Sequence, residues 1–247
     1  RRNADQWTQR RRHHAKHHLG TGSAGLLLLT NPRWEETLRP RMATTTLLAG
    51  DMGGTKTLLA LYGSDGSQLR LLHQERFRSG EWSSLEPMLD AFLRNRPDDL
   101  PAPVHACIAV AGPVRHREAR ITNLPWQLRE VDLARAAAME RLELVNDFGV
   151  LIYGLPHFDD SQQVILQKGE QDHGPMAILG AGTGLGMARG LKTDQGLMAL
   201  ASEGGHREFA PRNQAEWDLA CWLKQDLGVS RLSIERIVSG TGLGHVA

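Results

Sequence analysis

The chain has 247 residues, 40% of them apolar, and a formal net charge of +1. This composition is ordinary for a globular protein with one large domain or two small ones, and it allows a sizeable core without disulfides or metals. The two cysteines, Cys107 and Cys221, belong to no CxxC pair or Cys/His cluster. Their placement excludes a disulfide framework and a zinc motif, and it favours the reducing cytoplasm.

Residues 1–41 form a basic leader with nine Lys and Arg against three Asp and Glu, whereas the rest of the chain is acidic. Its run RRRHHAKHH could contact nucleic acid or an acidic membrane surface. The alternative is a disordered leader that is not native to the protein, because the first methionine, Met42, directly precedes the first strongly patterned segment. Translation is expected to start at Met42. The apolar run AGLLLLT is too short, and too poorly flanked, to favour a signal peptide.

Past Met42, apolar residues alternate or recur at helical spacing in successive segments. Strands are predicted over residues 45–51, 55–63, 67–77, 104–114, 141–147, 175–180 and 196–202, and helices over 82–95, 129–140, 148–155, 213–228 and 234–238. The apolar face of the first helix consists of Leu85, Met88, Leu89 and Phe92. Gly228 is expected to cap the fourth helix. Strands mixed with helices indicate an α/β protein, and two sets that begin around glycine turns predict two lobes, 42–157 and 158–247, with a cleft between them.

The first glycine turn lies in the stretch DMGGTKT, between two predicted strands. Gly53 and Gly54 allow positive φ and carry no side chains, so that successive backbone N–H groups can point at an anion. Thr55 and Lys56 add a hydroxyl group and a cation. The stretch is not a Walker loop, because a strand follows it instead of a helix. By turn chemistry alone, a plain hairpin is an equally good interpretation.

The second glycine stretch, GAGTGLG at residues 180–186, has glycine at every second position. It is not a dinucleotide fingerprint, since the required sixth residue is Leu185 or Met187. Its period suits a strand-turn-strand unit that offers one bare face to a ligand. Close sheet packing is the alternative, and it is less favoured when two such loops occur in one chain.

Polar side chains lie between and after these loops. Asn146 and Asp147 follow a predicted strand and open a helix, where a lone Asp is most often a helix cap. Glu203 and His206 flank two glycines in SEGGHREFAP, and Glu235 lies in SIERIVSGTGLG before one more glycine turn. Each taken singly is more often a solvated residue. The turn in SEGGHREFAP could present a carboxylate and an imidazole together.

The stretches GDMGGTKT, AVAGPV with ITNLPW, LVNDF, GAGTGLG, SEGGHREFAP and IERIVSGTGL resemble, in this order, the bacterial glucokinase family of the sugar kinase, heat-shock ATPase and actin superfamily. The resemblance covers residues 47–243, and ITNLPW, VNDF and EGGHREFAP make it specific. It implies a two-lobed, actin-like ATPase (ribonuclease H-like) α/β fold, with a small first lobe and a larger second lobe. Family members continue past the last glycine turn with elements that contact adenosine. The chain is therefore expected to be truncated, with an incomplete second lobe and weak or no kinase activity.

The resemblance implies ATP-dependent phosphorylation of glucose to glucose 6-phosphate. Expected ligands of ATP are Gly50, Asp51, Met52, Gly53, Gly54, Thr55 and Lys56 in the first loop and Gly182, Thr183 and Gly184 in the second, with Asp51 near the Mg²⁺ of MgATP. Expected ligands of glucose are Asn123, Asn146, Asp147, Glu203, His206 and Glu235. Asp147 would be the general base that takes the proton of the attacking hydroxyl. The cysteine-rich motif of related kinases is missing, so zinc is not expected.

The expected partners are glucose and MgATP, in the cytoplasm. An acidic, aromatic-poor body argues against nucleic acid, and no segment is long enough to cross a membrane. A homodimer is expected from the general frequency of such assemblies. The alternative is a sugar-binding regulator or an inactive, truncated kinase fragment. A regulator would be supported by a helix-turn-helix segment, and none is recognisable before Met42.

Overall fold

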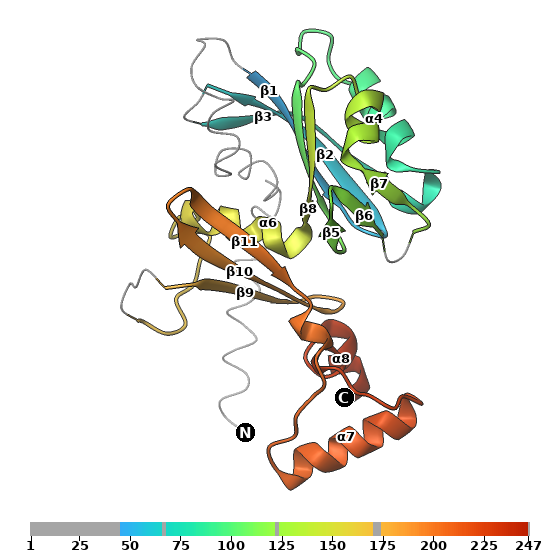
Figure 1. Cartoon of the computed structure of the whole chain (residues 1–247), viewed down its shortest axis with the longest axis vertical. Coiled ribbons are helices and arrows are strands. Elements are labelled where there is room, and N and C mark those ends of the chain that lie inside the picture. Colours follow the sequence, from blue (N-terminus) through green and yellow to red (C-terminus); the bar gives the residue numbers. More distant parts are fainter. Residues whose placement is uncertain (1–44, 66–67, 122–123, 170–173, 247) are drawn as a thin grey trace, which may run out of the picture.

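The computed structural model describes residues 45–65, 68–121, 124–169 and 174–246, in which a five-stranded sheet, a small three-stranded sheet and a second three-stranded sheet occur (Figure 1). The predicted start at Met42, the basic leader and the predicted glucose ligand Asn123 lie outside the described residues. No helix in the described part of the chain combines the length and apolar character that a membrane crossing needs.

The first sheet has five strands in the order β3-β2-β1-β4-β8. An antiparallel meander is formed by β1 (Thr45–Met52), β2 (Lys56–Ser64) and β3 (Leu69–Arg78), and the sheet continues with β4 (His105–Val110) and β8 (Arg141–Asn146), which run parallel to β1. At the carboxyl ends of the three parallel strands, Met52 pairs with Val110 and Val110 pairs with Asn146. Since adjacent strands lie about 4.8 Å apart, the first glycine turn and Asn146 are about 10 Å apart at one edge of the sheet.

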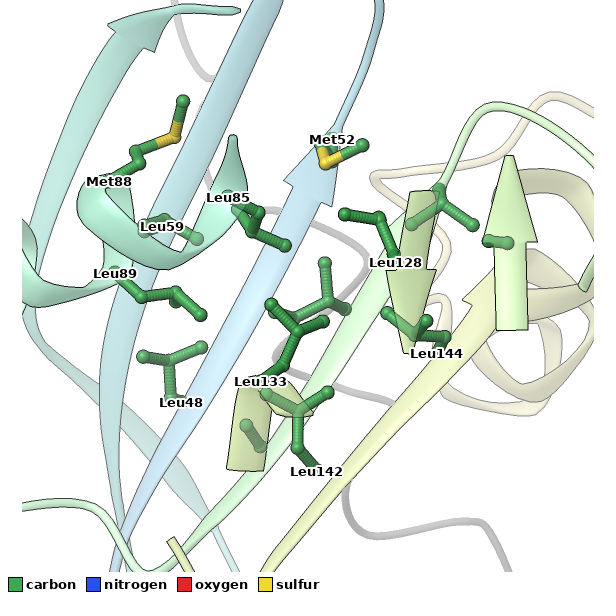
Figure 2. Packing of buried hydrophobic residues seen from close by; sticks show 14 of the residues in the cluster. Leu48, Met52, Leu59, Leu85, Met88, Leu89, Leu128, Leu133, Leu142 and Leu144 are labelled. Atoms are coloured by element: carbon green, nitrogen blue, oxygen red, sulfur yellow. The ribbon is translucent and has the colours of Figure 1, made fainter. Parts of the chain in front are cut away.

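Helices α4 (Leu85–Arg94) and α5 (Glu130–Ala136) cover one face of this sheet (Figure 1). All four apolar residues predicted for one face of α4 are fully buried. They pack on the leucines of the sheet, as Figure 2 shows for Leu85 and Leu89 beside Leu48 and Leu59. Each such side chain contributes about 1.5–3 kcal/mol of transfer free energy on burial. The core therefore gives the carboxyl edge a rigid support.

A small antiparallel sheet borders the same core and was not predicted. It consists of β5 (Val114–Arg115), β6 (Glu118–Arg120) and β7 (Gln127–Arg129). Leu128 is fully buried in the core, and Ala119 is nearly so. Strands of two or three residues are too short to show an alternating pattern, which explains why the sequence did not predict them.

Helix α6 (Asp147–Gly154) lies between the two sheets (Figure 1). On one side, Val150 packs with Ala49 and Ala60 of the first sheet. On the other side, Ile152 lies against Gly190 of the second sheet. A helix that is apolar almost all round is typical of such an enclosed position. Because Asp147 is its first residue, α6 sets where this carboxylate stands relative to both sheets.

The second sheet has the order β11-β10-β9 and is antiparallel throughout. Its strands are β9 (Met176–Ala181), β10 (Leu185–Thr193) and β11 (Gly196–Ser202). Helix α7 (Gln214–Asp226) follows, and it ends as predicted with Gly228 at φ +63° and a bond from Val229 N–H to Lys224 O. These are the features of a Schellman cap.

The predicted helix at 234–238 is a single 3₁₀ turn, η4 (Ile234–Arg236), and a helix, α8 (Gly240–Val246), stands where a glycine turn was predicted. The Ser239 side chain accepts a hydrogen bond from Gly242 N–H, as helix-capping serines do, which favours a helix despite three glycines. The remaining short helices are η1 (Ser79–Glu81), η2 (Leu155–His157) and η3 (Gly204–His206).

Candidate active site

The first glycine turn, residues 53–56, connects β1 to β2 at the carboxyl edge of the first sheet. Gly53 N–H donates to Lys56 O at 2.9 Å, and the fully buried Ser79 holds the turn from outside. The Ser79 hydroxyl donates to Gly53 O at 2.8 Å, and its N–H donates to Thr55 O at 3.0 Å. Ser79 was not predicted as a site residue, because only the folded hairpin brings it to the turn.

Gly53 and Gly54 do not use the positive φ that glycine allows. Among the described glycines only Gly112, Gly196 and Gly228 have positive φ. At Gly53 the need is for space, since a Cβ atom would lie 3.2 Å from Lys56 O. The turn thus keeps the backbone of Gly53 and Gly54 free of side chains while both residues have ordinary, negative φ.

The other predicted residues of the first loop divide between the core and the surface. Gly50 lies inside the sheet, where a Cβ atom would meet Ile108 at 3.0 Å, and the Met52 side chain is fully buried (Figure 2). Asp51 and Lys56 are exposed. Although Asp51 keeps accessible surface, desolvation by its neighbours raises the pKa of its carboxyl group.

The second glycine stretch connects β9 to β10, with residues 182–184 as the loop. No atom lies within 4 Å of a Cβ position at Gly182, whose carbonyl accepts a 2.7 Å hydrogen bond from Gly240 N–H. Gly180 and Gly186 are pairing partners in the strands, and both face the ring of Phe148. The predicted bare face is therefore partly filled, and the open positions lie in the loop.

Asn146 ends β8 and caps α6. Its Oδ1 accepts hydrogen bonds from Phe148 N–H at 3.1 Å and Gly149 N–H at 2.9 Å. Its Nδ2 donates to Gly112 O at 3.0 Å and to Asp147 Oδ1 at 3.1 Å. The cap is thus Asn146 and not Asp147, and all four hydrogen-bonding positions of the amide are occupied.

Asp147 is the first residue of α6, with its carboxylate facing the cleft. Its Oδ1 also accepts from Phe148 N–H at 2.9 Å. Burial is the main cause that raises the pKa of Asp147, and the negative charges of Asp51 and Glu203 raise it further, while the bond from Phe148 lowers it. A carboxylate whose pKa is raised toward neutrality is suited to accept a proton.

Glu203, His206 and Glu235 lie close together in the structure. His206 Nδ1 lies 2.8 Å from Glu235 Oε1, and His206 Nε2 lies 3.4 Å from Glu203 Oε2. Helix η3 carries the histidine, and η4 carries Glu235, whose carboxylate also borders Gly184 of the second loop. This cluster joins the second glycine loop to the polar residues of the site.

A single cleft of about 710 Å³ connects these elements. Its lining includes Gly54, Thr55, Asn146, Asp147, Gly182, Thr183, Gly184, Glu203, His206 and Glu235. Of the predicted residues that the structure describes, Gly50, Asp51, Met52, Gly53 and Lys56 do not line it. Gly112 and Phe148 line it without having been predicted. The same cleft is therefore lined by the backbone of both glycine loops and by carboxylate, amide and imidazole side chains.

The residues present fit a magnesium ion carried by phosphates. In the described part of the chain, no group of three or more His, Cys, Asp and Glu side chains could hold a metal ion by itself. Mg²⁺ commonly takes one or two carboxylates and completes its shell with water and substrate phosphates. Asp51 offers such a carboxylate, and its negative charge already acts on Asp147. A cation beside Asp51 would offset that repulsion.

The fold and the cleft define a class of protein. A mixed five-stranded sheet followed by a second α/β part, with a glycine loop from each facing one cleft, is the actin-like ATPase fold. A family model described as Glucokinase matches residues 48–247. The chain belongs to the glucokinase family.

Two relatives and one solved structure give the extent of the similarity. The chain is 41% identical to the glucokinase of a Nostoc species over 202 residues and 40% identical to that of a Synechocystis species over 209 residues, with 81% of this chain covered in each case. It spans 58% and 59% of the length of these relatives. The crystal structure of a glucokinase from an Antarctic psychrotroph has a TM-score of 0.69 and 30% identity, over 83% of this chain and 63% of that chain.

Proposed function

We propose that this protein transfers a phosphoryl group from ATP to glucose, with Asp147 as the general base. The observation that carries this proposal is the single cleft in which two glycine loops face the polar set around Asp147. The names of the relatives add weight to glucose as the acceptor and to kinase activity.

Asp147 would take the proton from the attacking sugar hydroxyl. The hydrogen bonds from Asn146 and Phe148 both end on Oδ1, so we assign the proton to Oδ2. These bonds fix the carboxylate in place, and fixed geometry lowers the barrier by avoiding reorganisation. The raised pKa of Asp147 increases its strength as a base.

Glu203, His206 and Glu235 would bind the sugar. A hexose hydroxyl donates and accepts hydrogen bonds, and carboxylates and an imidazole complement it. His206 is already bound between the two carboxylates, which orients all three groups before the sugar enters. Asn146 has no free hydrogen-bonding position in this arrangement, so we assign it chiefly to the orientation of Asp147.

The two loops would hold the phosphates of ATP. Gly54 and Thr55 present backbone on the first-sheet side of the cleft, and Gly182, Thr183 and Gly184 present it on the other side. Mg²⁺, when bound with ATP, supplies positive charge to the phosphate oxygens. Asp51 is the residue that we assign to it, at the end of β1. We assign no zinc to this chain.

A coupled assay for glucose 6-phosphate, with the chain and its Asp147→Asn variant, tests the proposal. Only weak turnover is expected of the chain, and the variant should lower it by at least about a thousandfold, as for loss of an essential general base with its orienting role. Glucose binding, measured by calorimetry, should persist in the variant. Equal turnover in both proteins would remove Asp147 from the mechanism. Glucose binding without turnover in either protein would favour the sugar-binding regulator or the inactive fragment.

The expected homodimer is tested separately by sedimentation analysis. A single species at the monomer mass over the concentration range of the assay would contradict it. The cytoplasmic location also stays a prediction, which fractionation of the source cells checks.

A further inference from the structure

Phe148 follows Asp147 in α6, and its ring enters the second sheet at the base of the glycine loop. A Cβ atom at Gly180 would lie 2.6 Å from the ring, and one at Gly186 would lie closer still. Both positions would overlap the ring, because real Cβ atoms do not approach within 3.0 Å of other heavy atoms. The two glycines therefore leave a slot that the ring fills.

The slot spans both strands of the hairpin. Gly180 of β9 and Gly186 of β10 are pairing partners, and one further pair, Ala181 with Leu185, separates them from the loop at residues 182–184. One rigid ring thus contacts both strands one residue pair before the loop. A ring has few rotatable bonds and transmits position well through a close-packed contact.

The backbone of the same residue holds the carboxylate. Phe148 N–H donates to Asp147 Oδ1 at 2.9 Å and to Asn146 Oδ1 at 3.1 Å. The ring therefore contacts the two strands that carry the loop, while the N–H group of the same residue fixes Asp147. No further residue stands between the two contacts.

We propose that Phe148 is a positioning residue that sets the separation between the Asp147 carboxylate and the loop at residues 182–184. This role rests on the proposed function, because the separation matters when a sugar hydroxyl beside Asp147 must meet a phosphoryl group held by the loop. Gly180 and Gly186 are glycines to admit the ring, and Gly182 and Gly184 are the glycines that face the ligand.

A nearby contact provides a matched control. Gly190 lies on the same strand, β10, and a Cβ atom there would lie 2.5 Å from Ile152 of the same helix, α6. This contact is one helical turn further from Asp147 and is remote from the loop. A purely structural role predicts that Gly186→Ala and Gly190→Ala have the same consequences.

The experiment compares the full chain with Gly186→Ala, Phe148→Leu, the double variant and Gly190→Ala. Hydrogen exchange of peptides that cover residues 182–184 reports how firmly the loop is held, without any need for turnover. The rate of glucose 6-phosphate formation and its KM for glucose report the chemistry. Thermal unfolding shows how much each variant destabilises the whole protein.

We expect Gly186→Ala and Phe148→Leu each to speed loop exchange about tenfold and to lower kcat about a hundredfold, the usual consequence of a 1 Å misplacement. The KM for glucose should change less than about twofold, because Glu203, His206 and Glu235 are untouched. The double variant should recover at least about a tenth of the wild-type rate, since leucine leaves room for the new methyl group. Gly190→Ala should lower the unfolding temperature and leave loop exchange and kcat unchanged.

Equal loop exchange in Gly186→Ala and Gly190→Ala would overturn the positioning role, and so would a double variant whose two losses simply add. Failure of the proposed function has a different signature, in which the unmodified chain forms no glucose 6-phosphate. In that case faster loop exchange confined to the Gly186 and Phe148 variants still supports the positioning role, and unchanged exchange refutes it.

Discussion

Asn146 makes four hydrogen bonds with one amide, and removing them in two stages separates its structural role from its catalytic role. Asn146→Ala removes both the cap on α6 and the two Nδ2 bonds. Asn146→Ser keeps a side-chain oxygen for the cap and loses the bonds to Gly112 and Asp147. The difference between the variants therefore isolates the cap.

The expected loss in the free energy of unfolding follows from the hydrogen bonds that each variant removes. An N-cap is worth about 1 kcal/mol, with a range of about 0.5–2. Each of the two Nδ2 bonds adds about 0.5–1.5 kcal/mol, and the bond to the Asp147 carboxylate lies toward the upper end because it is charged. Asn146 is half-buried, so water replaces part of what is lost. We expect losses in the free energy of unfolding of about 3 kcal/mol for alanine and about 2 kcal/mol for serine.

The assay combines urea unfolding with glucose 6-phosphate formation. Both variants should lose kcat to a similar degree, about tenfold or more, because both release the Asp147 carboxylate. Asn213→Ala is the matched control, since Asn213 caps α7 through a 2.9 Å bond from Glu216 N–H away from the cleft. It should cost about 1 kcal/mol with unchanged turnover. Full activity in Asn146→Ser would refute the orienting role, and equal stability of the serine and alanine variants would refute the capping role.

Three further predictions concern titration, thiol chemistry and the core. Activity should fall on the acid side as pH drops through the raised pKa of Asp147, and a pH–rate profile with an acid limb at the ordinary aspartate value would contradict this. Because the pKa is raised in the folded state, ionised Asp147 costs stability above that pKa, and the cost falls as pH drops until it is gone below the ordinary aspartate pKa of the unfolded chain, so Asp147→Asn should unfold at an equal or higher temperature at neutral pH. Of the two cysteines, the exposed Cys221 should react with a thiol reagent in the folded protein, and Cys107 only after unfolding, because burial raises its pKa to about 12; rapid reaction of both would refute this. Phe92→Ala should cost about 3–5 kcal/mol of unfolding free energy without changing kcat, and a smaller loss in urea unfolding would show that the core closes around the gap.

Local sequence patterns predicted a structural element correctly where the residues of one short segment determine that element. The apolar runs of β1 and β2, the alternation over β3 and the apolar face of α4 predicted these elements within a few residues. The cap at Gly228 was also predictable from local sequence, because the residue after a helix often adopts the left-handed conformation, which favours glycine. Residue types in order, from the first glycine turn to Glu235, were also enough to indicate the family.

Other features depend on contacts between segments that are distant in the sequence. Ser79 holds the first turn from the end of β3, and Gly112 receives the Asn146 amide from the end of β8. Neither role has a local pattern, because each partner is fixed only by strand order. The small sheet of β5, β6 and β7 was missed because its strands are shorter than a pattern can show.

The stretch GAGTGLG shows most clearly which features follow from the sequence and which depend on the tertiary structure. By itself the sequence determined that glycines recur at every second position between two strands, and therefore that side chains are absent from one face. Only the tertiary structure decided what occupies that face, since the Phe148 ring fills the space at Gly180 and Gly186 while the loop at Gly182 stays open. A missing side chain leaves space, and its use depends on which surface packs against it.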